Sequence, residues 1–415
     1  MPGTPKRFYL RREWRLERAA TVGSAPAGWT SDGRSTSLGS RGNLAAGAPT
    51  SQVLSGRLTR LVDALERERC AAALLVGPQH AAHLAGYSRL YSGPLAMLVF
   101  ADGRTTLVAP QYEVDAVRSR AQVGGVEGYG DYGFGLDLAA TTRLSEACAE
   151  LLPEGRIAVV SDIPGVAEAA ARIAGRESVA FDGPVRLVRL IKDADEWERL
   201  ARAYELSLAG QSAVAEGAQL GAREIDLYTA AFARAQAEAG APIEFQGDLL
   251  VGERSALVCG PIGVPGAKRA ESGDVVVSDI SVGHRGYWGD TARTFIVGSH
   301  SDAERAREFI RGVLEAAAAD LRPGVVAAEI FTKMHAEIVG RYPEGSFPHH
   351  GGHGLGVTVF EDPHLIPSDQ TPLQVGMVIA VEPGVYVPGR FGVRMENVYL
   401  VTEDGGRDLL SMYGG

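Results

Sequence analysis

The sequence predicts an α+β protein, in which a C-terminal domain with an internal pseudo-two-fold repeat follows an α/β N-terminal domain. Helical and strand-like stretches alternate between residues 54 and 175, and this alternation is typical of an α/β layer structure. From residue 193 onward, two helical stretches followed by two stretches rich in β-branched and aromatic residues occur twice in the same order. At 415 residues, the chain is long enough for two or three domains.

The first expected folded domain covers residues 51–188. Leu58, Leu61 and Leu65 recur at helical spacing and predict a helix from Leu54 to Arg69. Residues 1–50 are rich in Arg, Ser, Gly and Ala without a sustained period, so we expect a disordered tail there. No glycine-rich phosphate loop of the dinucleotide-binding kind occurs in this domain. The other expected elements are strands at 72–76, 95–100, 105–109 and 157–160, and helices at 143–152 and 166–175.

The second expected domain covers residues 189–415. The stretch Ser301-Asp-Ala-Glu304 has the pattern of a capping box and predicts that Ser301 caps a helix. The stretch Arg322-Pro-Gly324 then ends that helix. The expected helices lie at 193–216, 223–239, 301–321 and 326–339, and the expected strands at 275–282, 287–297, 377–381 and 394–402.

The bulk composition excludes some partners. The net charge is −10, but residues 1–50 carry eight Lys or Arg against three Asp or Glu, so the remaining chain carries −15. Such an acidic body argues against nucleic acid or an anionic membrane as the main partner. The three cysteines have neither metal nor redox spacing, and no apolar run approaches the length of a membrane span. With no signal-peptide pattern at the N-terminus, we expect a cytoplasmic protein.

Asp279 and Asp290 lie on the two strands of the first expected hairpin. They are eleven residues apart, and their midpoint, 284.5, is also the midpoint of the expected turn Gly283–Gly286. We therefore expect them to be directly opposed, with Cβ atoms about 4.5–5.5 Å apart. Like charges in this position destabilise a sheet, so the pair requires a cation or a proton between the side chains.

Glu382 and Glu396 repeat this arrangement in the last hairpin. Their midpoint is Gly389, inside the turn-like stretch 388–392. Between the two hairpins, glycines flank His353 in the stretch 347–356, so the backbone can approach another group closely and the imidazole can reach a ligand. A single acidic pair would most simply lie on a solvent-exposed face of the sheet. Two such pairs together with a histidine favour a metal site.

The charges of this set match two divalent cations. Four carboxylates are balanced by two such ions, and a neutral histidine with a bridging hydroxide would complete the coordination. Oxygen-rich ligation with one imidazole suits Mn²⁺, with Co²⁺, Zn²⁺ and Fe²⁺ as alternatives. Two metal ions about 3.5–4 Å apart would activate a shared water and hold the attacked carbonyl. A dinuclear hydrolytic centre is therefore expected.

The five residues, in this order, resemble the ligand set of the metallopeptidase family with the pita-bread fold. That family includes methionine aminopeptidase, Xaa-Pro aminopeptidase, Xaa-Pro dipeptidase (prolidase) and creatinase. The resemblance covers residues 54–415, and its N-terminal part looks like a creatinase-type domain, which implies the Xaa-Pro peptidase and creatinase branch. The motifs are Val-Val-Ser-Asp279-Ile, Gly-Asp290-Thr-Ala-Arg-Thr, Gly-His353-Gly-Leu-Gly, Val-Glu382-Pro-Gly and Gly-Val-Arg-Met-Glu396-Asn.

The resemblance also implies roles outside the ligand set. His349 matches a histidine that assists the substrate or the tetrahedral intermediate, and Arg394 matches an arginine near the site. Two family histidines are absent: Cys259 stands near the place of one, and Phe360 occupies the other, seven residues after the ligand histidine. In the family these histidines serve proton transfer and carbonyl contact, worth about 10²–10⁴-fold. Peptide cleavage is therefore in question, and Cys259 is a candidate acid or base.

We expect a dinuclear metal-dependent hydrolase of C–N bonds, most simply an Xaa-Pro aminopeptidase or dipeptidase with a small peptide or amide substrate. Two alternatives remain. The absent histidines favour a creatinase-like or ectoine-hydrolase-like amidohydrolase of a non-peptide metabolite, and the third reading is a catalytically idle binding module. The resemblance further implies a homodimer in which one subunit's N-terminal domain borders the other's active site. His80 and His83 would then be candidates to replace the absent histidines.

Overall fold

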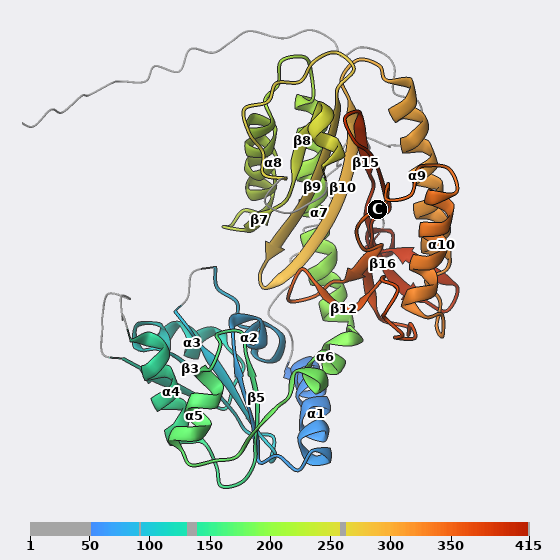
Figure 1. Ribbon diagram of the computed structural model, residues 1–415. Helices are drawn as coiled ribbons and strands as arrows, with labels where there is room; N and C mark the ends of the chain where they lie inside the picture. The colour runs from blue at the N-terminus through green and yellow to red at the C-terminus, as the bar shows by residue number, and fades with distance from the viewer. Residues whose placement is uncertain (1–50, 91–92, 131–138, 258–262, 414–415) are drawn as a thin grey trace, which may run out of the picture. The chain divides into compact units, whose positions relative to one another are not determined.

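The computed structural model describes residues 51–90, 93–130, 139–257 and 263–413, so the expected tail and Cys259 lie outside the described residues. The described chain comprises an N-terminal α/β part and a C-terminal α+β part, as predicted (Figure 1). Within the described ranges, no helix is long and apolar enough to cross a membrane. The expected domain boundary between residues 188 and 189 falls within a helix, and the domain limits stay a prediction.

A mixed sheet forms the centre of the N-terminal part. Across the described residues it has six strands in the order β4-β3-β2-β1-β5-β6. The central strand β1 pairs antiparallel with β2 and parallel with β5, and all of its residues are buried because helices cover both faces of the sheet. The elements are α1 (Ser51–Arg67), β1 (Ala72–Val76), α2 (Pro78–Ala85), β2 (Ala96–Phe100), β3 (Thr105–Pro110), α3 (Val114–Arg120), β4 (Gly125–Tyr129), α4 (Ala140–Leu151), β5 (Ile157–Ser161), α5 (Val166–Ile173), β6 (Ser178–Ala180) and α6 (Asp182–Leu190).

The C-terminal part contains the predicted repeat: a helix pair precedes each of two strand groups (Figure 1). Strand β9 pairs with β7, β8 and β10, and the later strands form a sheet in the order β12-β11-β13-β16-β17, with β14 paired to β15. The elements are α7 (Ala194–Gly217), α8 (Glu224–Ala239), β7 (Glu244–Gln246), β8 (Leu249–Val251), β9 (Val275–His284), β10 (Tyr287–Ile296), α9 (Ser301–Ala319), α10 (Ala327–Val339), β11 (Gly352–Gly354), β12 (Glu361–His364), β13 (Val378–Val381), β14 (Gly384–Val387), β15 (Phe391–Arg394), β16 (Asn397–Thr402) and β17 (Gly405–Asp408).

The turn of the first hairpin is shorter than predicted. Strands β9 and β10 continue to His284 and Tyr287, which pair with each other. The turn is therefore Arg285 and Gly286 alone, with φ of 51° and 81°. Positive φ at both central residues is typical of a type I′ turn, whose twist matches that of the paired strands.

This shorter turn changes the partners of the two aspartates. Asp279 lies opposite Ala292, and Asp290 lies opposite Ser281. The predicted direct opposition of Asp279 and Asp290 is wrong. They are diagonal neighbours on one face of the hairpin, because the two-residue turn moves its centre by one position. Diagonal neighbours remain within reach of each other.

The register of the late hairpin is as predicted. Val381 pairs with Asn397, and Gly384 pairs with Arg394, so both pairs are centred on position 389. Glu382 and Glu396 lie in the break between these two ladders, directly after β13 and directly before β16. They are thus brought opposite each other where neither belongs to a strand.

The capping prediction for α9 is wrong by one residue. His300 caps this helix, since its ring nitrogen accepts a hydrogen bond from the Ala303 amide at 3.3 Å. A capping box occurs instead at α7. There the Asp193 carboxylate accepts from the Glu196 amide, and the Glu196 carboxylate accepts from the Asp193 amide, both at 3.1 Å.

Candidate metal centre

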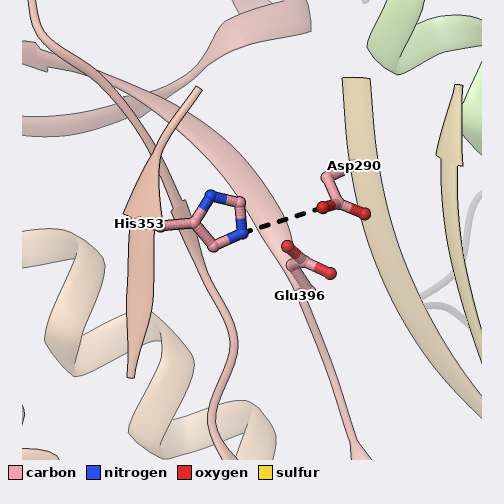
Figure 2. A group of neighbouring side chains, drawn as sticks. All are labelled: Asp290, His353 and Glu396. Atoms are coloured by element: carbon pink, nitrogen blue, oxygen red, sulfur yellow. Dashed lines mark ion pairs between the residues drawn. The ribbon is translucent and has the colours of Figure 1, made fainter. Parts of the chain in front are cut away.

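Five separate segments direct candidate ligands to one place. Asp279 lies on β9, Asp290 on β10 and His353 on β11, while Glu382 follows β13 and Glu396 precedes β16. Within the described residues, Asp290, His353 and Glu396 form a buried group whose ligand atoms all lie within 4.8 Å of one another (Figure 2). Nε2 of His353 is 3.7 Å from Oδ2 of Asp290 and 3.6 Å from Oε1 of Glu382. Assignment of all five residues as metal ligands stays a prediction.

The backbone of β10 positions two of these carboxylates. Oδ1 of Asp290 accepts hydrogen bonds from the Ser281 hydroxyl and the Thr291 amide, both at 3.0 Å. The Thr291 hydroxyl donates to the carbonyl of Glu396 at 3.1 Å, and the Glu396 amide donates to the carbonyl of Ala292 at 3.0 Å. These bonds hold β10 against the start of β16, so the two side chains meet.

The glycines beside His353 serve close packing of the strands. A Cβ atom at Gly352 would lie 2.1 Å from the carbonyl oxygen of Ala380, and one at Gly354 would lie 2.2 Å from that of Asp362. Real Cβ atoms do not approach an oxygen this closely, so β11 pairs tightly on both sides only with glycine at these positions. The group that the backbone approaches is therefore the neighbouring chain, and the imidazole alone projects into the site.

The carboxylates share a site that disfavours their charge. Burial raises the pKa of Asp290 well above its usual value, and the charges of Asp279 and Glu382 add to this effect. Burial likewise raises the pKa of Glu396 strongly, together with the charges of Asp290 and Asp279. Burial raises the pKa of Glu382 to about 8, although Arg394 opposes this shift. A bound proton or a bound cation would relieve this cost.

The donor set fits divalent cations. Oε1 of Glu396 is buried and has no hydrogen-bond partner among the described residues. A buried carboxylate oxygen without a partner costs free energy, and a bound cation would satisfy it. Carboxylates and one imidazole suit Mn²⁺, Fe²⁺, Co²⁺ or Zn²⁺.

His353 is held in the form that binds metals. Its Nδ1 donates to the carbonyl of Gly354 at 2.9 Å, because a carbonyl oxygen can only accept. Burial lowers the pKa of His353 to about 3, so the ring is neutral and Nε2 carries a lone pair. That lone pair faces Asp290 and Glu382. A backbone carbonyl that fixes the tautomer is common at metal sites.

Arg394 and His349 belong to one chain of polar contacts. Nη1 of Arg394 forms an ion pair with Oδ2 of Asp279, and its Nε donates to the Tyr386 hydroxyl at 2.6 Å. That hydroxyl lies 3.0 Å from Nε2 of His349, whose Nδ1 donates to the carbonyl of His350 at 2.7 Å. Both nitrogens of His349 are thus engaged by the protein, and its direct contact with substrate stays a prediction.

Sequence reasoning missed two residues of this site. Tyr386, on β14, joins Arg394 to His349 through its hydroxyl, and burial raises its pKa strongly. The carbonyl of Asp248 accepts from the Asp279 amide at 2.9 Å. Burial and the Asp279 charge raise the pKa of Asp248 to about 6. No sequence pattern marks Asp248, because pairing of the short strands β7 and β8 with β9 brings it to the site.

Phe360 forms an apolar wall beside His353. The two rings lie 4.5 Å apart between centroids, and the Phe360 residue is 58 % exposed. The next residue, Glu361, is fixed by an ion pair with Lys192 at 3.2 Å and by the Val357 amide at 3.0 Å. The position implied for a family histidine is therefore occupied by an exposed aromatic ring.

The suggestion that His80 and His83 serve a partner's active site is wrong. Both residues are buried, with 1 % and 2 % of their surface exposed. His80 contacts Arg189 at 2.9 Å, and His83 lies 3.6 Å from Glu196. They are enclosed within their own chain, so they cannot extend to another subunit.

Comparisons with known proteins agree with this fold. Residues 57–191 match the model for the creatinase/prolidase N-terminal domain, and residues 198–403 match that for metallopeptidase family M24. The chain is 35% identical to an Xaa-Pro dipeptidase of Pyrococcus furiosus over 238 residues, covering 56% of this chain and 67% of that protein. It is 27% identical to an Xaa-Pro dipeptidase of Pyrococcus horikoshii over 363 residues, which cover 86% of this chain and 97% of that protein.

A solved structure shows the same arrangement. The prolidase from Pyrococcus horikoshii OT3 superposes with a TM-score of 0.76 at 26% identity, covering 85% of this chain and 97% of that one. The predicted family is thereby confirmed, with both the N-terminal and C-terminal parts accounted for. The chain belongs to metallopeptidase family M24, the metal-dependent peptidases with the pita-bread fold.

Proposed function

We propose that this protein is a dinuclear metal-dependent hydrolase that cleaves the Xaa-Pro bond of dipeptides or of longer peptide N-termini. One observation carries the proposal: carboxylates with raised pKa values gather around His353, and Oε1 of Glu396 is buried without a partner. The similarity to Xaa-Pro dipeptidases supports the choice of substrate. The ligands would be Asp279, Asp290, His353, Glu382 and Glu396.

The protein's own groups would orient these ligands and the substrate. When bound, two divalent ions would supply a reactive water and polarise the scissile carbonyl. Arg394 holds the Asp279 carboxylate by an ion pair, and Tyr386 orients Arg394. His349, hydrogen-bonded to Tyr386, would respond to charge that develops on the substrate. Cys259 is the proposed proton donor in place of one absent histidine.

We further propose Mn²⁺ as the working metal and a homodimer as the assembly. The predominance of carboxylate ligands supports Mn²⁺. Only the family resemblance supports the dimer. Sedimentation equilibrium of the full-length protein at several concentrations tests the dimer, and a monomer at all of them would contradict it.

The decisive experiment measures hydrolysis by protein freed of metal with a chelator and then loaded with Mn²⁺. We expect turnover of Ala-Pro only in the loaded protein. The rate of Ala-Pro hydrolysis should fall at least about a thousandfold in Glu396→Gln, because metal-ion catalysis lowers the activation barrier by several kcal/mol. Glu344→Gln, an exposed carboxylate on a loop, is the matched control. Equal activity with and without metal would refute the proposal.

Phe360 favours a second candidate, hydrolysis of a small non-peptide amide. An exposed apolar ring beside His353 offers a cyclic or methylated substrate a surface to pack on, but offers a peptide carboxylate no hydrogen bond. Phe360→His tests this choice. A gain in Xaa-Pro cleavage would support a peptidase that lacks one acid–base group. Cleavage of cyclic amides by the wild type, with none of Xaa-Pro dipeptides, would support the second candidate.

A further inference from the structure

A second imidazole faces the candidate metal centre beside His353. Nε2 of His350 lies 3.5 Å from Oε1 of Glu382, and Nε2 of His353 lies 3.6 Å from the same oxygen. The two ring centroids are 5.5 Å apart. Donor atoms about 2.0–2.1 Å from one tetrahedral cation lie about 3.3 Å from each other. Taken pair by pair, each nitrogen thus approaches the Glu382 oxygen about as closely as two atoms that share a cation, although His350 is outside the group of three residues whose ligand atoms all lie within 4.8 Å of one another.

The tautomer of His350 directs a lone pair at this oxygen. Its Nδ1 lies 3.2 Å from the carbonyl of Gly352 and must donate to it, because a carbonyl can only accept. In the neutral ring, a proton on Nδ1 leaves Nε2 with a free lone pair. His353 is held in the same way by the carbonyl of Gly354.

This geometry places the lone pair of His350 Nε2 beside a carboxyl oxygen of Glu382. Among the described residues, the Nε2 contact of His350 is the Glu382 carboxylate, which carries no proton when ionised. The neighbouring His349 differs, since its Nε2 contacts the Tyr386 hydroxyl. Phe360 packs 5.9 Å from the His350 ring between centroids, and the His350 side chain is 25% exposed. A cation bound at the Glu382 oxygen would lie within reach of the Nε2 lone pair of His350.

We propose that Nε2 of His350 is a further protein ligand of the metal ion that Glu382 binds, in addition to the five residues of the proposed set. This inference rests on the proposed function, because it requires a metal centre. Imidazole suits Co²⁺ and Zn²⁺, whereas carboxylate suits Mn²⁺. His350 therefore shifts the site towards Co²⁺ and Zn²⁺ relative to a site with a single histidine.

Calorimetric titration of metal-free, full-length protein with Co²⁺ and with Mn²⁺ tests the proposal without any substrate. We expect His350→Ala to raise the Kd for Co²⁺ by at least about tenfold, and that for Mn²⁺ by less. The visible spectrum of the Co²⁺ protein should change, and added imidazole should restore it. His364→Ala is the matched control, since its ring is also partly exposed but contacts Asp362 at 3.7 Å.

The outcomes separate this inference from the proposed function. If the wild type binds neither metal, both the His350 inference and the proposed function are refuted. If the wild type binds and His350→Ala binds with a Kd within about twofold for both metals, the His350 assignment alone is refuted. An equal loss for Co²⁺ and Mn²⁺ that His364→Ala reproduces would also refute it, as it would indicate a general disturbance. A Co²⁺-selective loss restored by imidazole supports it.

Discussion

Two clusters of carboxylates in this chain differ in how their charge is balanced. At the start of α7, Asp193, Asp195 and Glu196 surround the fully buried Arg57. Arg57 approaches Asp193 at 2.7 Å and Asp195 at 2.9 Å, and Arg199 also contacts Asp195 at 2.9 Å. We call this group the junction cluster. It carries its own counter-charges.

The metal centre is not balanced in this way. It gathers Asp279, Asp290, Glu382 and Glu396, and the cation paired with them among the described residues is Arg394. Clustering of several carboxylates is therefore common to both groups and does not by itself indicate a metal, although in the junction cluster Glu196 is buried while Asp193 and Asp195 are only partly buried. What distinguishes the two is the deficit of positive charge, and the following predictions test that difference.

The largest expected effect comes from removing the cation of the junction cluster. Arg57→Met should lower the free energy of unfolding by about 3–5 kcal/mol, because it removes the buried cation that Asp193 and the buried Glu196 share. It also removes the hydrogen bond of Arg57 to the carbonyl of His83 at 3.0 Å. Urea denaturation gives the value. Arg60→Met, exposed on the same helix, should change it by no more than about 0.5 kcal/mol. If Arg57→Met lowered the free energy of unfolding by no more than Arg60→Met, the junction cluster would not need Arg57 for stability.

The next largest expected effect is on how the free energy of unfolding depends on pH through the junction cluster. Burial raises the pKa of Glu196 from 4.5 to about 7, with Arg57 and Lys192 opposing and Asp193 adding. Between these pH values the folded state binds more protons than the unfolded state, so stability falls as pH rises. The contribution of Glu196 is fully present below about pH 4.5 and lost above about pH 7.

Glu196→Gln should remove this slope. The decrease in the free energy of unfolding between about pH 4.5 and about pH 8 should be smaller by about 3 kcal/mol than in the wild type. Urea denaturation at a series of pH values gives the difference between the two proteins. Parallel curves for wild type and variant would contradict a raised pKa at Glu196, and a steeper curve for the variant would reverse its sign.

Sequence periodicity predicted most of the fold, but it could not place the turn of the first hairpin. The four residues Gly283 to Gly286 could equally form a longer turn, and the sequence gives no sign that Arg285 adopts a φ of 51°. The chain forms a type I′ turn because the twist of this turn matches that of long paired strands. In the late hairpin, the glycine at the centre coincides with the actual turn, so the predicted register around Gly389 was correct.

The candidate ligands could be proposed from linear order because each lies in a short motif within or directly beside a strand. The residues that surround these ligands could not be proposed from the sequence. Tyr386 matters through contacts with Arg394 and His349, and Asp248 through strand pairing with β9. The direction of the His350 ring depends on the carbonyl of Gly352. Except for this local contact of His350, these interactions join residues through tertiary packing and strand pairing, which no local pattern encodes.

The smallest effect, and the sharpest contrast, comes from deleting one charge in each cluster of the metal-free protein. Asp290→Asn should raise the free energy of unfolding by about 1–2 kcal/mol at pH 8, because replacing a badly compensated buried charge is often stabilising. The amide oxygen can still accept from Ser281 and Thr291. Asp193→Asn should instead lower it by about 1–3 kcal/mol, since it breaks charged hydrogen bonds to Arg57.

Chelator-treated protein and urea denaturation give both values, and pH supplies the internal control. Because the pKa of Asp290 is raised, its charge destabilises the folded protein only above the unfolded-state pKa of about 4, so the gain from Asp290→Asn should disappear near that pH. Arg57 lowers the pKa of Asp193 despite the opposing effect of burial. The loss from Asp193→Asn should therefore persist above about pH 4 and shrink only below it. If both variants lost stability equally at pH 8, the charge deficit could not be what distinguishes the metal centre from the junction cluster.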